Sequence, residues 1–215
     1  MSDTFTGFPV EAFDFYEQLE ANNNKAWWTE HRGTYETSVK APLVALTDEL
    51  EPEFGTPKLF RPYNDQRFSK GAPLKTHQGA TVMLEDSVGL YVQVSTEGLM
   101  VAGGWFSPGG DQVRRYREAV AGAGGVVLEK LVAGLPRTWD IDGNKLATRP
   151  KGYDIDHPRI DLLRNRRLTV ARRYPVEPWL STRKVLTTVR KDWRLIMPLL
   201  EWLADHVGPV DDPGA

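Results

Sequence analysis

One turn-rich segment concentrates side chains that could bind an anion. Residues 60–79, FRPYNDQRFSKGAPLKTHQG, contain two arginines, two lysines and a histidine against a single acidic residue. Arginine binds carboxylate or phosphate through a planar fork of donors, and lysine supplies a point charge. The segment therefore predicts contact with a small anionic ligand, such as a phosphorylated one.

A second basic stretch, RPKGYDIDHPRIDLLRNRR at 149–167, is the natural partner for the first. Glycine has no side chain, so the glycines at 71, 79 and 152 would let backbone donors approach a ligand closely. If the two stretches face one another, they form a concave basic pocket. The predicted ligand-binding residues are Arg61, Asp65, Arg67, Lys70, Lys75, His77 and Lys151.

The same pattern predicts how the segment is presented. Alternate residues of an extended chain point in opposite directions, so we expect Phe68 to be buried while Arg67 and Ser69 face elsewhere. Arg67 and Lys75 should point into the pocket, with Lys151 approaching from the other side. Asp65 and His77 are the candidates for proton transfer, although no reaction follows from the sequence.

Two other interpretations of this charge stay open. The segment could be an interaction module for nucleic acid or an acidic protein, in which case several phosphate contacts would make binding steeply salt-dependent. It could also be architectural, with arginines neutralised internally. The formal net charge of −2 does not favour bulk binding to nucleic acid or to an anionic membrane.

Several familiar motifs are not supported. GAPLKT at 71–76 lacks the glycine directly before lysine that a phosphate-binding loop requires. DIDH at 154–157 favours helix capping over a metal site, so no metal or cofactor is predicted. No nucleophile-elbow serine is present. Trp27, Trp28 and His31 are expected to pack rather than to act on a ligand.

The elements that must position these residues indicate an α+β fold. Apolar periodicity predicts helices before residue 57 and after residue 181, with Trp28, Tyr35, Leu46, Trp193 and Leu200 largely buried. Asparagines at 22–24 end the first helix and one of them caps the second, which Pro42 should kink or divide. Alternating runs at 81–85, 90–95 and 99–105 predict an antiparallel sheet, and TWDIDGNKLAT predicts a small hairpin. We expect one domain over 1–207 and a disordered tail over 208–215.

Charge and composition suggest where the protein works. Residues 1–57 contain 11 acidic residues against 3 Lys or Arg, whereas the remainder contains 18 against 24, so the later part should carry a basic face. There is no secretory signal, no membrane-spanning run and no cysteine. A cytoplasmic protein without a membrane partner is expected.

Five segments together resemble a known family. They are NNNKAWW (22–28), FRPYNDQRFSKGAPLKTHQG (60–79), VAGGWFSP (101–108), RPKGYDIDHPRIDLLRNRRLTV (149–170) and MPLLEWL (197–203). Their order resembles a family of conserved hypothetical bacterial and fungal proteins, domain of unknown function family 2461. The resemblance covers nearly the whole chain and implies a single domain, but it implies no activity.

The family's hallmark is similar to R-x-x-R-D-x-R-F-S-K followed by P-Y-K-T. It matches this chain at Arg61, Asp65, Arg67, Phe68, Ser69, Lys70, Pro73, Lys75 and Thr76. Two positions depart from it, because Asn64 stands where arginine is frequent and Leu74 where tyrosine is frequent. If that tyrosine touches a ligand elsewhere in the family, the departure weakens a ligand role here; if it only packs, leucine is a fair substitute.

Overall fold

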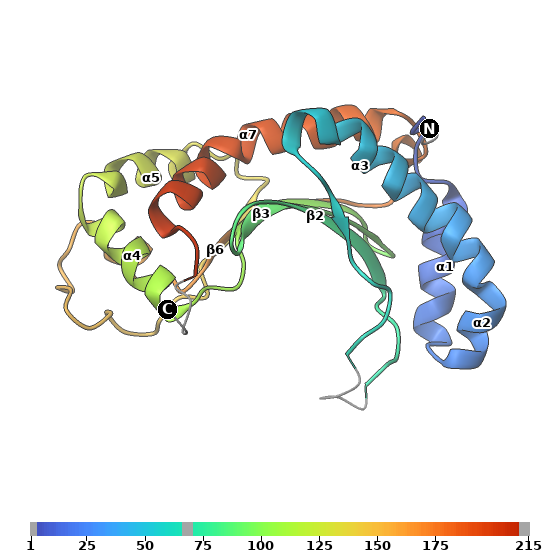
Figure 1. Ribbon diagram of the computed structural model, residues 1–215, viewed down its shortest axis with the longest axis horizontal. Helices are drawn as coiled ribbons and strands as arrows, with labels where there is room; N and C mark the ends of the chain where they lie inside the picture. Colours follow the sequence, from blue (N-terminus) through green and yellow to red (C-terminus); the bar gives the residue numbers. More distant parts are fainter. Residues whose placement is uncertain (1–3, 66–70, 211–215) are drawn as a thin grey trace. The chain divides into compact units, whose positions relative to one another are not determined.

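A computed structural model describes residues 4–65 and 71–210 and shows the predicted α+β fold (Figure 1). Six strands form one antiparallel sheet in the order β1-β2-β3-β4-β6-β5. The chain divides into two compact units. Unit 1 comprises Met1–Val82, Tyr91–Val101 and Arg173–Asp192, and unit 2 comprises Met83–Leu90, Ala102–Arg172 and Trp193–Ala215.

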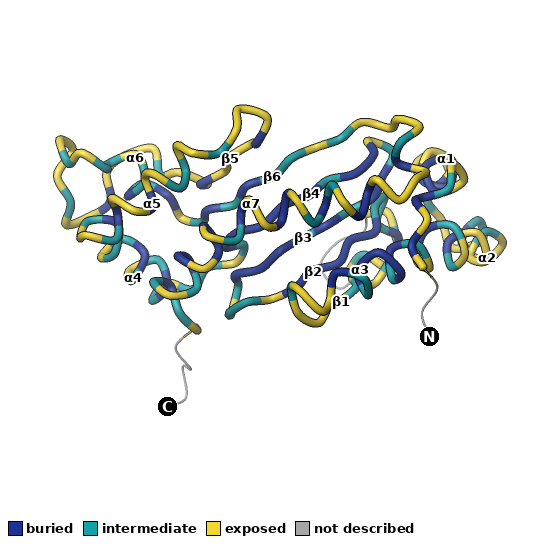
Figure 2. Tube along the Cα trace, turned by 90° about the horizontal axis from the view of Figure 1, so that it is seen from above, coloured by how far each residue is buried: buried dark blue, intermediate teal, exposed yellow. Residues whose placement is uncertain are grey.

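The three central strands lie where alternation predicted them. They are β2 (His77–Glu85), β3 (Val88–Ser95) and β4 (Gly98–Trp105). Strand β3 has fully buried valines at 88, 92 and 94, visible as a dark stretch of the tube in Figure 2. The turn into β3 contains Ser87 with φ of 65°, and β4 begins at Gly98 with φ of 105°. A β-carbon at Gly98 would lie 2.2 Å from the Tyr174 carbonyl oxygen, so only glycine fits there.

Unit 1 begins with a helical segment that Asn and Pro divide as expected. It contains α1 (Val10–Ala21), α2 (Lys25–Thr34), the π-helix η1 (Tyr35–Lys40) and α3 (Ala41–Phe54), shown in blue to cyan in Figure 1. The Asn24 side chain caps α2 by accepting the Trp27 N–H at 3.0 Å. Pro42 lies in the first turn of α3, directly after the π-helix.

Aromatic side chains form much of the unit 1 core. Trp28 and Tyr35 are buried, with ring centroids 4.9 Å apart, and Leu46 is fully buried. Trp27 is half-buried against Phe15, at 5.3 Å between ring centroids, as expected for a flank position. The 3-10 helix η2 (Pro178–Ser181) and the first part of α7 (Lys184–Val207) complete the unit.

Unit 2 is built around one buried glutamine. Its helices are α4 (Gly110–Ala121), α5 (Gly124–Ala133), the short α6 (Ile160–Leu163) and α7 from Trp193 onward. Gln112 is fully buried; its amide donates to the carbonyls of Asp86 and Gly208 at 3.1 and 2.7 Å and accepts from Gly109 N–H. Trp193 and Leu200 are fully buried, as predicted.

The predicted hairpin after Trp139 is wrong. Strand β5 (Asp140–Asp142) pairs with β6 (Leu168–Tyr174), with Ile141 opposite Val170. The chain leaves the sheet at Gly143, whose carbonyl accepts the N–H groups of Arg166 and Arg167. The glycine indicates that the chain turns there, but a local pattern does not predict which distant strand pairs with β5.

The end of the chain is partly tied to unit 2. The Gly208 carbonyl accepts from Gln112, and the Val210 N–H donates to Asp86 at 3.3 Å. Residues 211–215 of the predicted tail lie outside the described residues.

Candidate functional site

The basic segment of unit 1 forms an antiparallel arm, which we define as residues 58–65 and 71–77. Strand β1 (Lys58–Leu59) pairs with β2, and further out Tyr63 forms a bridge with Leu74. The Lys75 N–H donates to the Pro62 carbonyl at 2.7 Å. The short β1 agrees with the expectation of an edge strand interrupted by proline.

Neutral amides hold the arm in place. Asn23 pairs with the backbone of Leu74 in both directions, accepting its N–H at 3.1 Å and donating to its carbonyl at 2.9 Å. Asn64 donates to the carbonyls of Ala72 and Leu74 at 2.8 and 3.0 Å. Sequence reasoning gave the asparagines at 22–24 only local roles, ending one helix and capping the next, because a contact 51 residues away leaves no local pattern.

The π-helix is connected to the base of the arm. The Tyr35 hydroxyl donates to the Gln78 side chain at 2.6 Å, and Gln78 in turn donates to the carbonyls of Phe60 and Gly79 at 2.8 and 3.0 Å. Burial raises the pKa of Tyr35 above its ordinary value, so the phenol stays protonated and keeps donating. These hydrogen bonds therefore fix the base of the arm.

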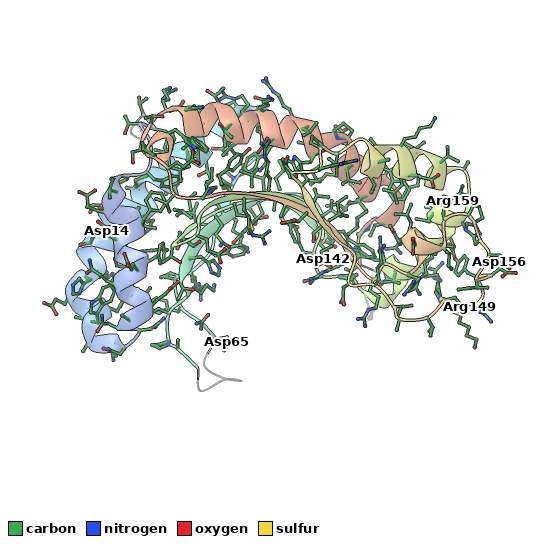
Figure 3. The ribbon with its side chains drawn as sticks, turned by 180° about the vertical axis from the view of Figure 1, so that it is seen from behind. Asp14, Asp65, Asp142, Arg149, Asp156 and Arg159 are labelled. Carbon is green, nitrogen blue, oxygen red and sulfur yellow. The ribbon has the colours of Figure 1, made fainter. Side chains whose placement is uncertain are left out.

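One side of the arm encloses a hollow of about 760 Å³, lined by residues 58–61, 63–65 and Lys75, which we name the basic hollow. It contains three cationic side chains, Lys58, Arg61 and Lys75, and one carboxylate, Asp65, which Figure 3 labels on the arm. The Lys75 ammonium donates to the Arg61 carbonyl at 2.8 Å and lies 5.6 Å from the Phe60 ring centre. Within the described part of the chain, the charged groups of Lys58 and Arg61 have no hydrogen-bond or ion-pair partner.

The other predicted residues of this segment have different placements. Arg67, Lys70 and the anchor Phe68 lie outside the described residues. His77 is half-buried at the start of β2 and is not among the residues lining the basic hollow. Burial, together with the nearby Lys75 charge, lowers the pKa of His77, so its ring is neutral at neutral pH.

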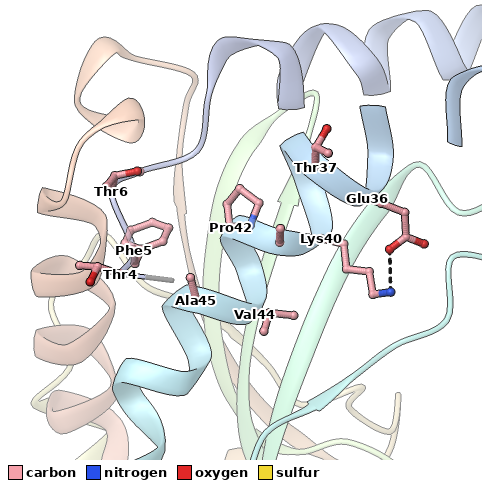
Figure 4. Close-up of a pocket in the computed structure, with 11 residues that line it drawn as sticks. Thr4, Phe5, Thr6, Glu36, Thr37, Lys40, Pro42, Val44 and Ala45 are labelled. Carbon is pink, nitrogen blue, oxygen red and sulfur yellow. Dashed lines mark hydrogen bonds and ion pairs between the residues drawn. The ribbon is translucent and has the colours of Figure 1, made fainter. Parts of the chain in front are cut away.

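A second hollow of unit 1 differs in how its charges are used. It has a volume of about 500 Å³ and lies between residues 4–7 and the chain from Glu36 to Ala45 (Figure 4). Its charged side chains, Glu36 and Lys40, form an ion pair at 2.7 Å. These charges already neutralise one another, so this hollow offers an anion less than the basic hollow does.

In unit 2 the arginines of 149–167 bind the protein's own backbone. Arg159 donates to the last carbonyls of α4, those of Val120, Ala121 and Gly122, at 2.7, 2.9 and 3.2 Å. Arg164 donates to the carbonyls of Leu146 and Ala147 at 2.8 and 2.9 Å. Figure 3 labels Arg159 in this unit.

The remaining arginines of this stretch have partners nearby. Arg149, also labelled in Figure 3, donates to the Tyr153 carbonyl at 2.8 Å, and Arg166 donates to the backbone and side-chain oxygens of Asn144. Arg167 pairs with Asp142. Lys151 is exposed, and its ammonium has no partner in the described ranges 4–65 and 71–210. A joint pocket of 60–79 with 149–167 involves both units and stays a prediction.

The DIDH stretch organises a turn before α6. Asp154 accepts the Asp156 N–H at 3.1 Å, and His157 accepts the Arg159 N–H at 3.0 Å through Nδ1. The described residues contain no group of three or more His, Asp or Glu side chains placed to hold a metal ion. The predicted helix cap is wrong, because the N-cap residue of α6 is Arg159 and no side chain in the described part of the chain caps the helix; Asp154 and His157 instead stabilise the turn that precedes it.

One known protein family matches most of the chain. A family described as Conserved hypothetical protein (DUF2461) matches residues 11–202. The chain belongs to this family. No curated protein matches the sequence. The match covers the arm of unit 1 and the basic stretch of unit 2, in agreement with the resemblance carried by the five sequence segments.

The two departures from the family hallmark have structural roles in this member. Leu74 is 2% exposed and lies beside Trp28 and Tyr63, so it packs. Asn64 spans the arm by bonding to Ala72 and Leu74. Among the described residues, no helix is both long and apolar enough to cross a membrane.

Proposed function

We propose that the basic hollow of the arm binds a small anionic ligand, such as a phosphorylated one. The observation that carries this proposal is the difference in how cations are used. Lys58 and Arg61 line a hollow without a partner in the described chain, whereas five arginines of unit 2 donate to the protein itself.

The charge and donors of the hollow suit an anion. An arginine fork can bind two oxygens of a phosphate or carboxylate at once, and a nearby lysine adds a point charge. The Lys75 side chain is already oriented by the Arg61 carbonyl, so less side-chain entropy is lost when a ligand binds.

The test is thermal unfolding of the full chain with inorganic phosphate, pyrophosphate and citrate. An anion at 100 times its dissociation constant should stabilise the wild type by about 2.7 kcal/mol. Arg61→Ala should lose most of this response. Arg137→Ala is a matched control, because Arg137 is an exposed arginine of unit 2 without a partner in the described chain. Equal responses of the two variants would contradict the proposal.

Lys151→Ala tests the larger pocket predicted from the sequence. If 149–167 contributes to the same ligand, this variant should weaken anion binding as Arg61→Ala does. Lys130→Ala is its control, since Lys130 is an exposed lysine of α5. An unchanged response in Lys151→Ala would restrict the site to the arm.

A further inference from the structure

Three hollows of unit 1 meet at one side chain, Tyr63. It lines the basic hollow, a hollow of about 270 Å³ shared with Trp28 and Arg61, and a hollow of about 520 Å³ shared with Trp28 and Leu74. Because they share lining residues, the three hollows lie next to one another around Tyr63. We name the three together the Tyr63 groove.

The aromatic side chains of the groove are exposed yet fixed. Tyr63 is 49% exposed, and Trp28 Nε1 donates to its hydroxyl at 3.1 Å, with the two rings at 72°. Phe60 is 39% exposed and is held 5.9 Å from the Tyr91 ring. An exposed ring with a fixed orientation is suited to stacking against a flat ligand.

Cationic side chains continue along the groove beyond the basic hollow. Lys25 and Arg32 line the 520 Å³ hollow. Arg32 lies 3.8 Å from Glu36 and is largely exposed, while the Lys25 ammonium has no partner in the described part of the chain. The groove therefore combines positive charge with aromatic surface, as do proteins that bind nucleotide bases and phosphates together.

We propose that the ligand of this site is a nucleotide, with its phosphate at Lys58 and Arg61 and its base stacked on Tyr63. The phosphate half rests on the function proposed above, whereas the base half rests on the position and exposure of the Tyr63 ring. The Tyr63 hydroxyl already accepts from Trp28, so its own proton remains available to a base or ribose oxygen. The shared chemistry fits a free nucleotide or one nucleotide of a single strand.

The decisive experiment compares two ligands with the same sugar and phosphate. Isothermal titration of the full chain with ribose 5-phosphate and with nucleoside 5′-monophosphates isolates the contribution of the base. Stacking on an aromatic side chain should make the monophosphates bind roughly tenfold more tightly or better. Tyr63→Ser should remove this ratio, Tyr63→Phe should keep it, and Arg61→Ala should weaken both ligands.

The wild type alone separates the two proposals, and Tyr63→Ser tests where the base lies. Equal affinity of the wild type for ribose 5-phosphate and the monophosphates overturns the nucleotide proposal and leaves anion binding intact. No binding of either overturns both. A monophosphate preference that survives Tyr63→Ser also overturns the assignment of the base to Tyr63.

Titration with single strands of about ten nucleotides tests whether the nucleotide is free or part of a strand. This length is within the range that known strand-binding folds cover. Binding that is a hundredfold tighter than that of a monophosphate, with a slope of log K against log salt steeper than about −2, assigns the site to single-stranded nucleic acid. Weaker strand binding with retained monophosphate binding assigns it to a free nucleotide. Both results support the chemistry of the groove.

Discussion

The arm of unit 1 and the 149–167 stretch of unit 2 have similar composition but use their cations differently. In the arm, Lys58 and Arg61 line a hollow and have no partner in the described residues. In unit 2, Arg159 and Arg164 together donate to five backbone carbonyls. Equal charge density in a sequence can therefore mean a site for a ligand or a structural clamp.

The difference follows from what each backbone lacks. The end of α4 and the irregular chain around residues 143–159 have carbonyls without regular partners, and arginine donors satisfy them. The arm satisfies most of its backbone by antiparallel pairing and by the amides of Asn23 and Asn64, so of its cations only Lys75 donates to a carbonyl and Lys58 and Arg61 are not needed for that purpose. Mutations in the two regions should therefore have separable effects on stability and on binding.

The largest expected loss of stability is in unit 2. Arg159→Ala should lower the free energy of unfolding by about 2–3 kcal/mol, because three carbonyls at the end of α4 lose a charged donor. Urea unfolding measures the change. Arg149→Ala, which removes one exposed hydrogen bond, is the control and should cost less than about 0.5 kcal/mol. Similar values for the two variants would refute the clamp interpretation of Arg159.

A smaller loss of stability is expected at Asn23, whose side-chain amide holds the arm. Asn23→Ala should destabilise by about 1–2 kcal/mol, since both hydrogen bonds to Leu74 are lost. Hydrogen exchange at the Leu74 amide should accelerate at the same time. Asn22→Ala removes one exposed bond to the Gln18 carbonyl and should leave that amide unchanged. Protection of Leu74 that persists in Asn23→Ala would show that the arm is held by other contacts.

A pH-dependent effect on stability is expected at Asp142 of unit 2. The Asn144 N–H and then Arg167 lower the pKa of Asp142. A carboxylate with a lower pKa in the folded state stabilises above its ordinary pKa of about 3.8, and this contribution is lost as the pH falls below that value. Asp142→Asn should cost about 0.5 kcal/mol at pH 6, because the pair is half-exposed, and progressively less toward pH 3. A pH-independent difference would contradict the assignment.

The smallest stability effect is expected in the arm. Arg61→Ala should change the free energy of unfolding by less than about 0.5 kcal/mol, since the side chain has no partner in the described chain. The loss of anion response would then occur in a protein of unchanged stability. A destabilisation comparable to that of Arg159→Ala would erase the difference between the two regions and favour an architectural arm.

Much of the fold was predictable because its signals are local. Alternation located the three central strands, and the spacing of apolar residues predicted the burial of Trp28, Tyr35 and Trp193. The asparagines at 22–24 ended one helix, and Asn24 capped the next. Charge and glycine content in the sequence also indicated the arm as the candidate site, although the ligand itself stays a proposal.

By itself, the sequence determined the elements, the core side chains and the two concentrations of positive charge. Only the tertiary structure decided which strand β5 joins, that Asn23 clamps Leu74, and that three hollows meet at Tyr63. Residue types and periodicity report preferences over a few neighbouring residues. The partner of a hydrogen-bonding or charged group is set by which distant segments the folded backbone brings within about 3 Å of it.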